Sequence, residues 1–188
     1  MNGFQICKYL WAGVYALWLV WALRTKPARI KETIISRLSH VLPVVAAFIL
    51  MFTRYAGNSW LWAHVFPDEL WVNLLGILLT FAGLAFAFWA RVRLGGNWSS
   101  SVTVKVGHEL VRNGPYRWVR HPIYSGLVLA MSGTAIAKGE VRGVIAVILV
   151  FIGFTIKSRI EERAMIDTFG AEYEDYRRST GGILPKLH

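Results

Sequence analysis

Long apolar runs constrain this chain more than any other feature of its sequence. Residues 4–23, 38–56 and 70–90 form three runs of about 20 residues, the length that spans a bilayer as a helix. Two shorter runs, residues 123–137 and 141–156, flank a polar break around Gly139. A soluble domain of 188 residues, even one that is 55% hydrophobic, would not usually gather its apolar residues in such runs. The sequence therefore predicts an all-α integral membrane protein with about five transmembrane helices.

The last two runs are each short for a spanning helix. Because only a few residues separate them, we expect a helical hairpin, either tilted across the bilayer or partly re-entrant. In the third run Gly76, Gly83 and Ala87 are small residues that allow close helix approach, so the helices should form a compact bundle. Beyond the last run the sequence predicts a helical tail that is broken near Gly170.

The cations of the chain are sorted by loop. Most of its 21 Lys and Arg residues lie in residues 24–37, in residues 91–120 and in the tail from Lys157 onward, and none lies in residues 57–69. By the positive-inside rule the N-terminus then faces outward, and both the 91–120 stretch and the C-terminal tail face the cytoplasm. The run at residues 4–23 is too long for a signal-peptide core and has its positive cluster after it, so we expect it to be retained.

Two classes of ligand have little support. A formal charge of +10 can indicate nucleic acid, but these cations are spread over loops and do not gather on one basic domain. The single cysteine, Cys7, offers no disulfide or thiolate cluster, and the five histidines lack the spacing of a metal motif. We expect neither nucleic acid nor a metal.

Residues 114–126 connect a polar loop to the fourth apolar run. Pro122 suits the first turn of a helix, so a helix should begin at His121-Pro122. The positive end of such a helix, with Arg117, Arg120 and His121 beside it, would attract an anionic group. A positively charged anchor at the membrane surface is the alternative.

Two adjacent acids, Glu161 and Glu162, follow the last apolar run. Acids are costly directly beneath a membrane helix and tend to find a cation or a ligand. Lys157 is four residues before Glu161 and would share its helix face. Simple pairing with Lys157, Arg159 or Arg163 is the alternative to a ligand-binding role.

Three spaced blocks in the second half of the chain carry a family resemblance. They are His108-x-Leu110-Val111 with Gly114-x-Tyr116, then Arg120-His121-Pro122-x-Tyr124-x-Gly126, then Glu161-Glu162 ahead of Phe169-Gly170-x-Glu172-Tyr173-x-x-Tyr176. In order and spacing these blocks resemble the isoprenylcysteine carboxyl methyltransferase family, whereas Arg-His-Pro alone also occurs in membrane phospholipid methyltransferases and sterol reductases. The resemblance covers roughly residues 91–188 and implies that these form the catalytic region, whereas residues 1–90 match only as hydrophobic helices. We therefore expect a single membrane domain, residues 1–188, with three N-terminal helices in residues 1–90.

The same resemblance implies an activity and a site. The enzyme would use S-adenosylmethionine to methylate the carboxylate of a prenylated cysteine or a similar lipophilic carboxylate that enters from the bilayer. The cofactor pocket would be cytoplasmic, formed by residues 91–122 and the C-terminal helix. The cofactor contacts implied by the family fall on His108, Leu110, Val111, Tyr116, His121, Pro122, Ile123, Tyr124 and Glu161.

One departure concerns the acceptor. The family's substrate-binding arginine aligns with Lys157, or less well with Arg159. A lysine holds a carboxylate as a point charge without the two-pronged fork of arginine, so an acceptor other than a protein prenylcysteine stays open.

The residue types suit methyl transfer to an ionised carboxylate, which needs alignment and exclusion of water more than a general base. Arg120 and His121 at the helix start could hold the cofactor's carboxylate, and Glu161 its amine or ribose. Three alternatives stay open: a phospholipid or amine N-methyltransferase with Glu161 or Glu162 as proton acceptor, an NADPH-dependent reductase, and a non-enzymatic membrane scaffold.

Overall fold

The structure, a computed structural model, describes residues 2–22, 32–53, 60–95 and 110–186. Its described part is helical, with short 3-10 turns and two isolated backbone bridges between segments distant in sequence. The helices are α1 (Gly3–Ala22), α2 (Ile34–Phe52), α3 (Leu70–Leu94), α4 (Pro122–Lys138), α5 (Val141–Phe169) and α6 (Ala171–Ser179), and the 3-10 turns are η1 (Trp60–Trp62) and η3 (Gly114–Arg117).

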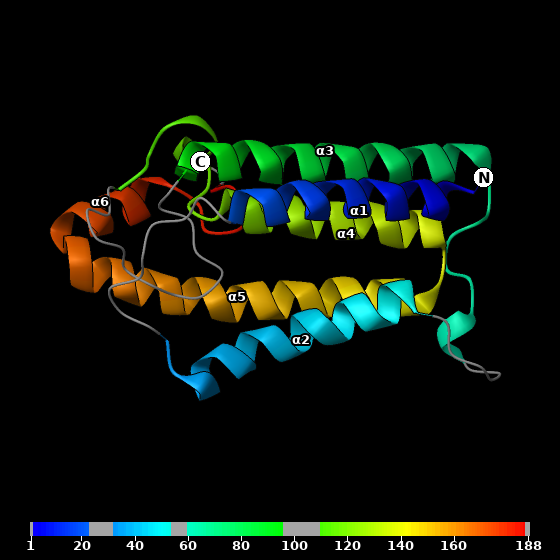
Figure 1. The fold of residues 1–188 in the computed structure, drawn as a ribbon, viewed down its shortest axis with the longest axis horizontal. Coiled ribbons are helices and arrows are strands. Elements are labelled where there is room, and N and C mark those ends of the chain that lie inside the picture. The colour runs from blue at the N-terminus through cyan, green and yellow to red at the C-terminus, as the bar shows by residue number, and fades with distance from the viewer. Residues whose placement is uncertain (1, 23–31, 54–59, 96–109, 187–188) are drawn as a thin grey trace.

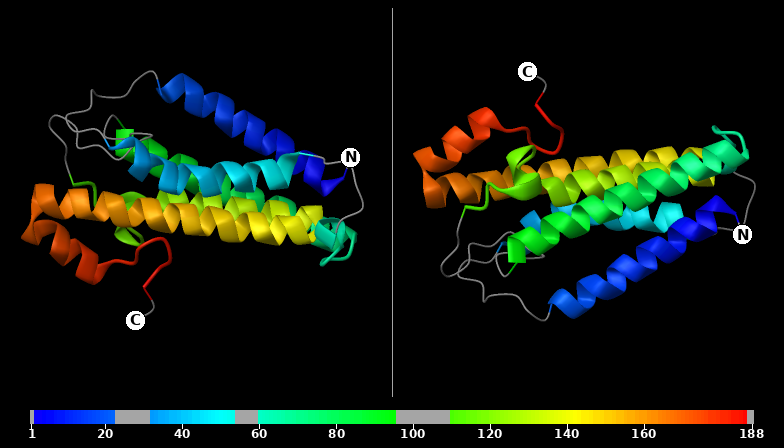
Figure 2. Two further views of the ribbon diagram at one scale, coloured as in Figure 1. Left: turned by 90° about the horizontal axis from the view of Figure 1, so that it is seen from below. Right: turned by 90° about the horizontal axis from the view of Figure 1, so that it is seen from above.

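The five long helices form two groups (Figures 1 and 2). α3 packs mainly on α4, with α1 against both, and α2 packs on α5. The α4–α5 hairpin, which turns at Gly139 in a left-handed conformation, joins the two groups, so the predicted hairpin is confirmed. The short α6 folds back at one end of the bundle, and the N-terminus lies at the other end (Figure 1).

Glycines set the distance between α3 and α4. A Cβ placed on Gly83 would lie 2.4 Å from the backbone nitrogen of Ala130, and one placed on Gly126 would lie 2.5 Å from the carbonyl oxygen of Gly83. Gly76 and Gly133 repeat this close approach two turns away. The backbones therefore touch, as small residues allow in membrane helices, and the expected role of the glycine face of α3 is confirmed.

Replacing Gly83 with alanine should destabilise the α3–α4 pair by about 1 to 3 kcal/mol, because the new methyl group meets backbone that cannot rotate away. Gly13 on α1 is the matched control, since nothing lies within 4 Å of a Cβ built there. Gly13→Ala should be neutral or slightly stabilising, as alanine favours a helix. Thermal unfolding of the purified variants in detergent would check this. Equal midpoints for the two variants would show that the α3–α4 contact is looser than described.

Hydrogen bonds inside the bundle attach α1 to the α3–α4 pair. Trp11 Nε1 donates to Thr134 Oγ1 at 2.9 Å, and the Thr134 hydroxyl lies 3.2 Å from that of Thr80. Cys7 Sγ lies 3.4 Å from the same Thr80 hydroxyl. Cys7, the single cysteine, is thus buried at a helix interface.

Three helix boundaries differ from the apolar runs. α2 begins at Ile34, because Thr33 caps it by accepting from the amide of Ser36, and it ends at Phe52. α3 continues through two arginines of its last turn to Leu94, where Gly95 takes φ 55° and ends it. α5 continues through the polar residues after the last apolar run to Phe169, as the predicted helical tail with a break near Gly170 requires. Polar residues did not end these helices, because they tolerate a helix as well as most apolar ones do, whereas glycine does not.

The break in the tail is confirmed: Gly170, at φ 53°, separates α5 from α6. By length and apolarity, three helices of the described part can cross a membrane, namely α2, α3 and α5.

Candidate active site

The N-terminus of α4 forms one wall of the candidate site. The turn η3 delivers the chain to Pro122, which occupies the first turn of α4, with His121 at the cap position. The predicted helix start at His121-Pro122 is therefore confirmed. His121, Pro122 and Ile123 are all buried, so this end of the helix faces protein.

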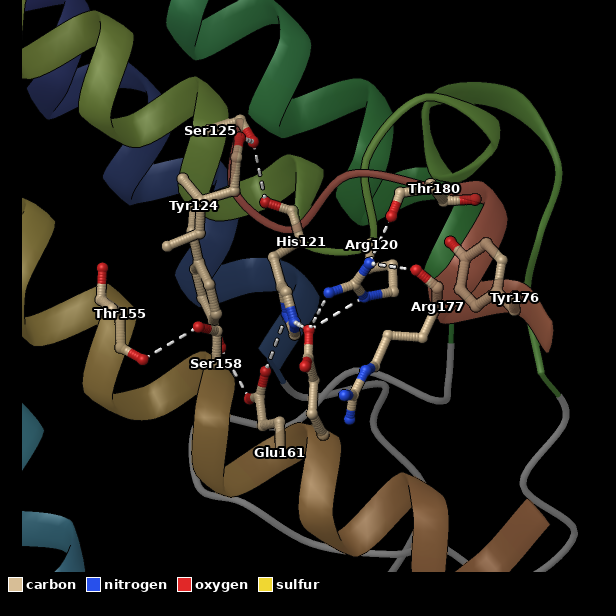
Figure 3. A network of polar contacts seen from close by, with 12 residues as sticks. Arg120, His121, Tyr124, Ser125, Thr155, Ser158, Glu161, Tyr176, Arg177 and Thr180 are labelled. Atoms are coloured by element: carbon tan, nitrogen blue, oxygen red, sulfur yellow. Dashed lines mark hydrogen bonds and ion pairs between the residues drawn. The ribbon is translucent and has the colours of Figure 1, made fainter. Parts of the chain in front are cut away.

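The last turns of α5 form the opposite wall (Figure 3). Tyr124 donates a hydrogen bond of 2.6 Å to Glu161, and Lys157 Nζ lies 4.0 Å from the same carboxylate oxygen. His121 Nδ1 lies 3.4 Å from the other oxygen of Glu161. The side chain of Glu161 remains 23% exposed.

Glu162 binds a different set of cations. Arg120 donates to it through Nε at 2.9 Å and Nη2 at 2.7 Å, and His121 Nε2 lies 3.1 Å away. Both arginine donors reach the same oxygen, Glu162 Oε1, and charge-assisted hydrogen bonds of this kind are stronger than neutral ones. Arg120 also donates to the backbone carbonyl oxygens of Thr180 and Arg177. Glu162 therefore holds the start of α4 to the end of α5 and to the tail.

Three rings stack at the centre of the site. Tyr124 lies between His121, with ring centroids 5.5 Å apart and planes 4° apart, and Phe154 of α5, with centroids 4.7 Å apart and planes 7° apart. Lys157 Nζ lies 5.5 Å from the centroid of the Tyr124 ring. The stack separates the charged end of the site from the apolar interior of the hairpin, with Lys157 at the boundary.

The C-terminal segment closes this end of the bundle. The amides of Arg120 and His121 donate to the carbonyl oxygens of Gly181 and Gly182 at 2.8 and 3.3 Å. On α6, the Tyr176 hydroxyl donates to the carbonyl oxygen of Tyr116. Burial raises the pKa of Tyr176 to about 12, so this donor keeps its proton at neutral pH. The contact of residues 180–183 with the start of α4 was not predicted from the sequence, because this segment has no motif.

His121 is the titratable group that links both glutamates. Burial alone would lower the pKa of its imidazole, but hydrogen bonds to Glu161 and Glu162 outweigh this effect and raise the pKa above the ordinary histidine value. Burial raises the pKa of the Tyr116 phenol, and the charge of Glu161 adds to the rise. At neutral pH the site therefore combines carboxylates, a neutral phenol and an imidazole biased toward its charged form.

Because folding raises the pKa of His121, the stability of the folded state should depend on pH. A group whose pKa is raised on folding stabilises the folded state fully below its unfolded pKa, near 6.5, and loses that contribution as the pH rises through its folded pKa. The thermal midpoint should therefore fall more with rising pH above about 6.5 in the wild type than in His121→Gln. His64→Gln, at an exposed histidine far from the site, should behave like the wild type. Parallel pH profiles for wild type and His121→Gln would contradict the assignment.

The remaining predicted site residues lie as follows. Tyr116 is buried, and its hydroxyl donates to the carbonyl oxygen of Ala90 at 3.4 Å. Val111 packs against the core and Leu110 is half-buried, whereas His108 lies outside the described residues. Arg159 is exposed, two residues along α5 from Lys157. The structure thus brings together Arg120, His121, Tyr124, Lys157, Glu161 and Glu162.

A buried pair of ionisable side chains at the start of α2 was missed from sequence. His40 Nε2 lies 3.0 and 3.2 Å from the two carboxylate oxygens of Glu32, and both side chains are at most 4% exposed. A Cβ on Gly153 of α5 would lie 2.9 Å from the carbonyl oxygen of His40, so this turn of α2 lies against the helix that carries Phe154. Ionisable side chains buried in membrane helices are uncommon, and that was the available signal.

Comparison with known proteins agrees with this arrangement. The family model described as phospholipid methyltransferase matches residues 71–172. Protein-S-isoprenylcysteine O-methyltransferase of Rattus norvegicus is 30% identical over 146 residues, which cover 72% of this chain and 51% of the relative. The probable protein-S-isoprenylcysteine O-methyltransferase of Oryza sativa subsp. indica is 32% identical over 130 residues, 65% of this chain and 68% of that protein.

A solved structure shares the fold. The eukaryotic intramembrane Ras methyltransferase ICMT superposes with a TM-score of 0.55 at 23% identity, covering 84% of this chain and 54% of that one. Fold and site thus define a helical membrane protein with its polar cluster at one end of the bundle. The chain belongs to the isoprenylcysteine carboxyl methyltransferase family, within the group that the phospholipid methyltransferase model describes. It spans about half the length of the rat relative.

Proposed function

We propose that this chain transfers a methyl group from S-adenosylmethionine to the carboxylate of a prenylated cysteine or a similar lipophilic carboxylate. The observation that carries the proposal is the placement of Lys157. It lies between the apolar interior of the α4–α5 hairpin and the Glu161–Tyr124 pair, where a lipid-borne carboxylate would meet a cofactor held by the polar cluster. The names of the rat and rice relatives support the same reaction.

The residues present fit the cofactor chemically. Glu161 offers a partly exposed carboxylate for the amine or ribose of S-adenosylmethionine, and the N-terminus of α4 offers positive potential for its carboxylate. The Tyr124 ring, held flat between His121 and Phe154, suits contact with adenine or the sulfonium. The family correspondence adds His108, Leu110, Val111, Tyr116, Pro122 and Ile123 to this pocket.

The reaction needs little proton chemistry. When bound, S-adenosylmethionine supplies an electrophilic methyl group, and a carboxylate oxygen forms the new C–O bond as the C–S bond breaks and its electron pair returns to sulfur. Lys157 would hold the acceptor carboxylate, with Arg159 as the reserve for this role. Arg120 and Glu162 would act as positioning residues, since their pairing fixes His121 and the start of α4. The aromatic stack would exclude water from the line of attack.

Binding of S-adenosylhomocysteine to the purified chain in detergent, measured by calorimetry, tests this proposal. A folded protein that binds no such ligand would overturn the methyltransferase assignment. An amine N-methyltransferase would bind the same ligand, so the acceptor experiment in the Discussion separates the two reactions.

We further propose that α1–α5 all cross the membrane, with the N-terminus outside and the site in the cytoplasm. The cation distribution supports this orientation. α4, with 17 residues, is about 26 Å long and would span a bilayer core of about 30 Å only with its flanking residues. Thiol labelling on a Cys7→Ser background should reach Asp68→Cys from outside intact cells and should not reach Ser179→Cys. The reverse pattern would invert the orientation.

A further inference from the structure

Two exposed tryptophans mark the ends of an apolar stretch on the outer surface of α3. Trp71 lies in the first turn, and Trp89 follows 18 residues later, an axial rise of about 27 Å. The large side chains exposed between them are all apolar, namely Leu74, Leu75, Leu78 and Phe81. This length is close to the thickness of a bilayer hydrocarbon core, about 30 Å, and tryptophan is enriched at both of its boundaries. Trp89 therefore marks the membrane boundary at the C-terminal end of α3.

Trp118, just before α4, lies at the same level. Its ring meets that of Trp89 edge to face, with centroids 5.8 Å apart and planes at 66°. Phe86 extends the group, since its ring centroid lies 6.1 Å from that of Trp89. Trp89 and Trp118 remain 39% and 49% exposed, so much of both rings faces the surroundings of the protein.

Two exposed arginines flank these rings. Arg93 follows Trp89 by one turn of α3, and its side chain would lie 3.3 Å from a Cβ placed on Gly114, the first residue of η3. At the last residue of η3, the guanidinium carbon of Arg117 lies 5.6 Å from the centroid of the Trp118 ring. We call the following residues the Trp–Arg surface: Phe86, Trp89, Arg93, Arg117 and Trp118.

The two arginines of this surface have no acid partner within the described part of the chain. Arg120 binds Glu162 inside the candidate site, but no carboxylate of the described residues lies within ion-pair distance of Arg93 or Arg117. The structure thus separates two cations that were expected to act together at the start of α4. Arg120 binds within the protein, whereas Arg117 faces outward at the membrane boundary.

We propose that the Trp–Arg surface binds an anionic phospholipid, with Arg93 and Arg117 as the ligands of its phosphate. The guanidinium fork matches phosphate oxygens, and the rings of Trp89 and Trp118 would contact the glycerol region at headgroup level. An anionic lipid is favoured over a zwitterionic one because its headgroup brings no ammonium group to two uncompensated cations. The site is independent of methyl transfer and would stand even if the proposed activity failed.

Thermal unfolding of the purified full chain in detergent tests the site with three probes. Dioleoylphosphatidylglycerol is the anionic lipid, dioleoylphosphatidylcholine is the zwitterionic lipid with the same chains, and sodium phosphate is the free anion. Phosphatidylglycerol should raise the midpoint in a saturable manner, because a ligand that binds only the folded state stabilises it. The other two probes should have much smaller effects. An equal effect of phosphatidylcholine or of sodium phosphate would overturn the assignment to an anionic phospholipid.

Variants connect the lipid effect to this surface. Arg117→Ala should raise the half-saturating lipid concentration about tenfold, the scale of one charge-assisted hydrogen bond, and Arg117→Lys should raise it less, because the charge remains. Because Arg117 is exposed, its loss should not impair folding. Arg178→Ala is the matched control, since Arg178 is an exposed arginine of α6 that pairs with Asp175, and it should leave the lipid response unchanged. An unchanged response in Arg117→Ala would overturn the proposal.

The level of the surface in the bilayer is a second test. On a Cys7→Ser background, a bimane label would be attached to Val92→Cys, beside the surface, or to Leu78→Cys, between the two tryptophans; both positions are exposed on α3. In vesicles, lipids spin-labelled close to the headgroup should quench the Val92 label more than lipids labelled at the chain end, and the Leu78 label should show the reverse. Stronger quenching of the Val92 label from the chain end would place the arginines inside the hydrocarbon core and overturn the proposal.

Discussion

Glu161→Gln is expected to weaken binding of S-adenosylhomocysteine by about 10- to 100-fold, the scale of losing hydrogen bonds to one charged group. The change keeps the shape of the side chain but removes the charge that Tyr124, His121 and Lys157 all face. Tyr124→Phe should cause a smaller loss, since it keeps the ring stack and removes only the donor to Glu161. Calorimetry on the purified variants would measure both.

Glu172→Gln is the matched control for Glu161→Gln. Glu172 also pairs with an arginine, but it is 61% exposed on α6 and distant from the ring stack. Its loss should leave affinity unchanged, and the thermal midpoints should show that all variants are folded. Wild-type affinity in a folded Glu161→Gln protein would remove Glu161 from the cofactor site.

Lys157→Ala is expected to raise the KM for a lipophilic carboxylate acceptor by about 10- to 100-fold and to leave cofactor affinity nearly unchanged. The reason is that Lys157 is the cation at the apolar boundary of the site, only 12% exposed and beside the Tyr124 ring. Lys157→Arg should retain much of the activity, because the positive charge is preserved. Kinetics with N-acetyl-S-farnesylcysteine as acceptor would measure the effect.

The same variants separate carboxyl from amine methylation. A lysine at this point would repel an ammonium acceptor, so an amine-specific enzyme should be unaffected or improved by Lys157→Ala. Activity on phosphatidylethanolamine alone, insensitive to Lys157→Ala, would therefore rule out the carboxyl reaction. Arg159→Ala is the control, since Arg159 is exposed on the same helix. A loss confined to Arg159→Ala would move the acceptor role two residues and keep the chemistry.

Features with local causes were predictable from the sequence. Apolar runs predicted the five long helices, Pro122 the start of α4, and Gly170 the break between α5 and α6. The spacing of Gly83 and Ala87 indicated the face on which helices approach closely. The error was at the start of α2, where polar residues were assigned to a loop although they continue the helix.

The partners of the charged residues were decided by tertiary structure. Sequence spacing suggested that the glutamates pair along their own helix, and Lys157 does approach Glu161. However, Glu162 binds Arg120, 42 positions away, and Glu161 accepts from Tyr124, 37 positions away. Periodicity fixes which residues share a helix face, but not how two helices are rotated and aligned against each other. That alignment depends on contacts between α4 and α5, such as that of Gly143 with Ala135, and it determines which polar groups meet.

The Glu32–His40 pair shows the same limit at the start of the chain. Its members are eight positions apart, in a region whose apolar run indicated only a membrane helix. The sequence by itself determined that this chain forms membrane helices, where most of them begin, and which of its motif residues resemble those of a methyltransferase. The tertiary structure decided which of those residues form one buried cluster, because the cost of burying a charge is met only by a partner that folding brings within a few ångströms.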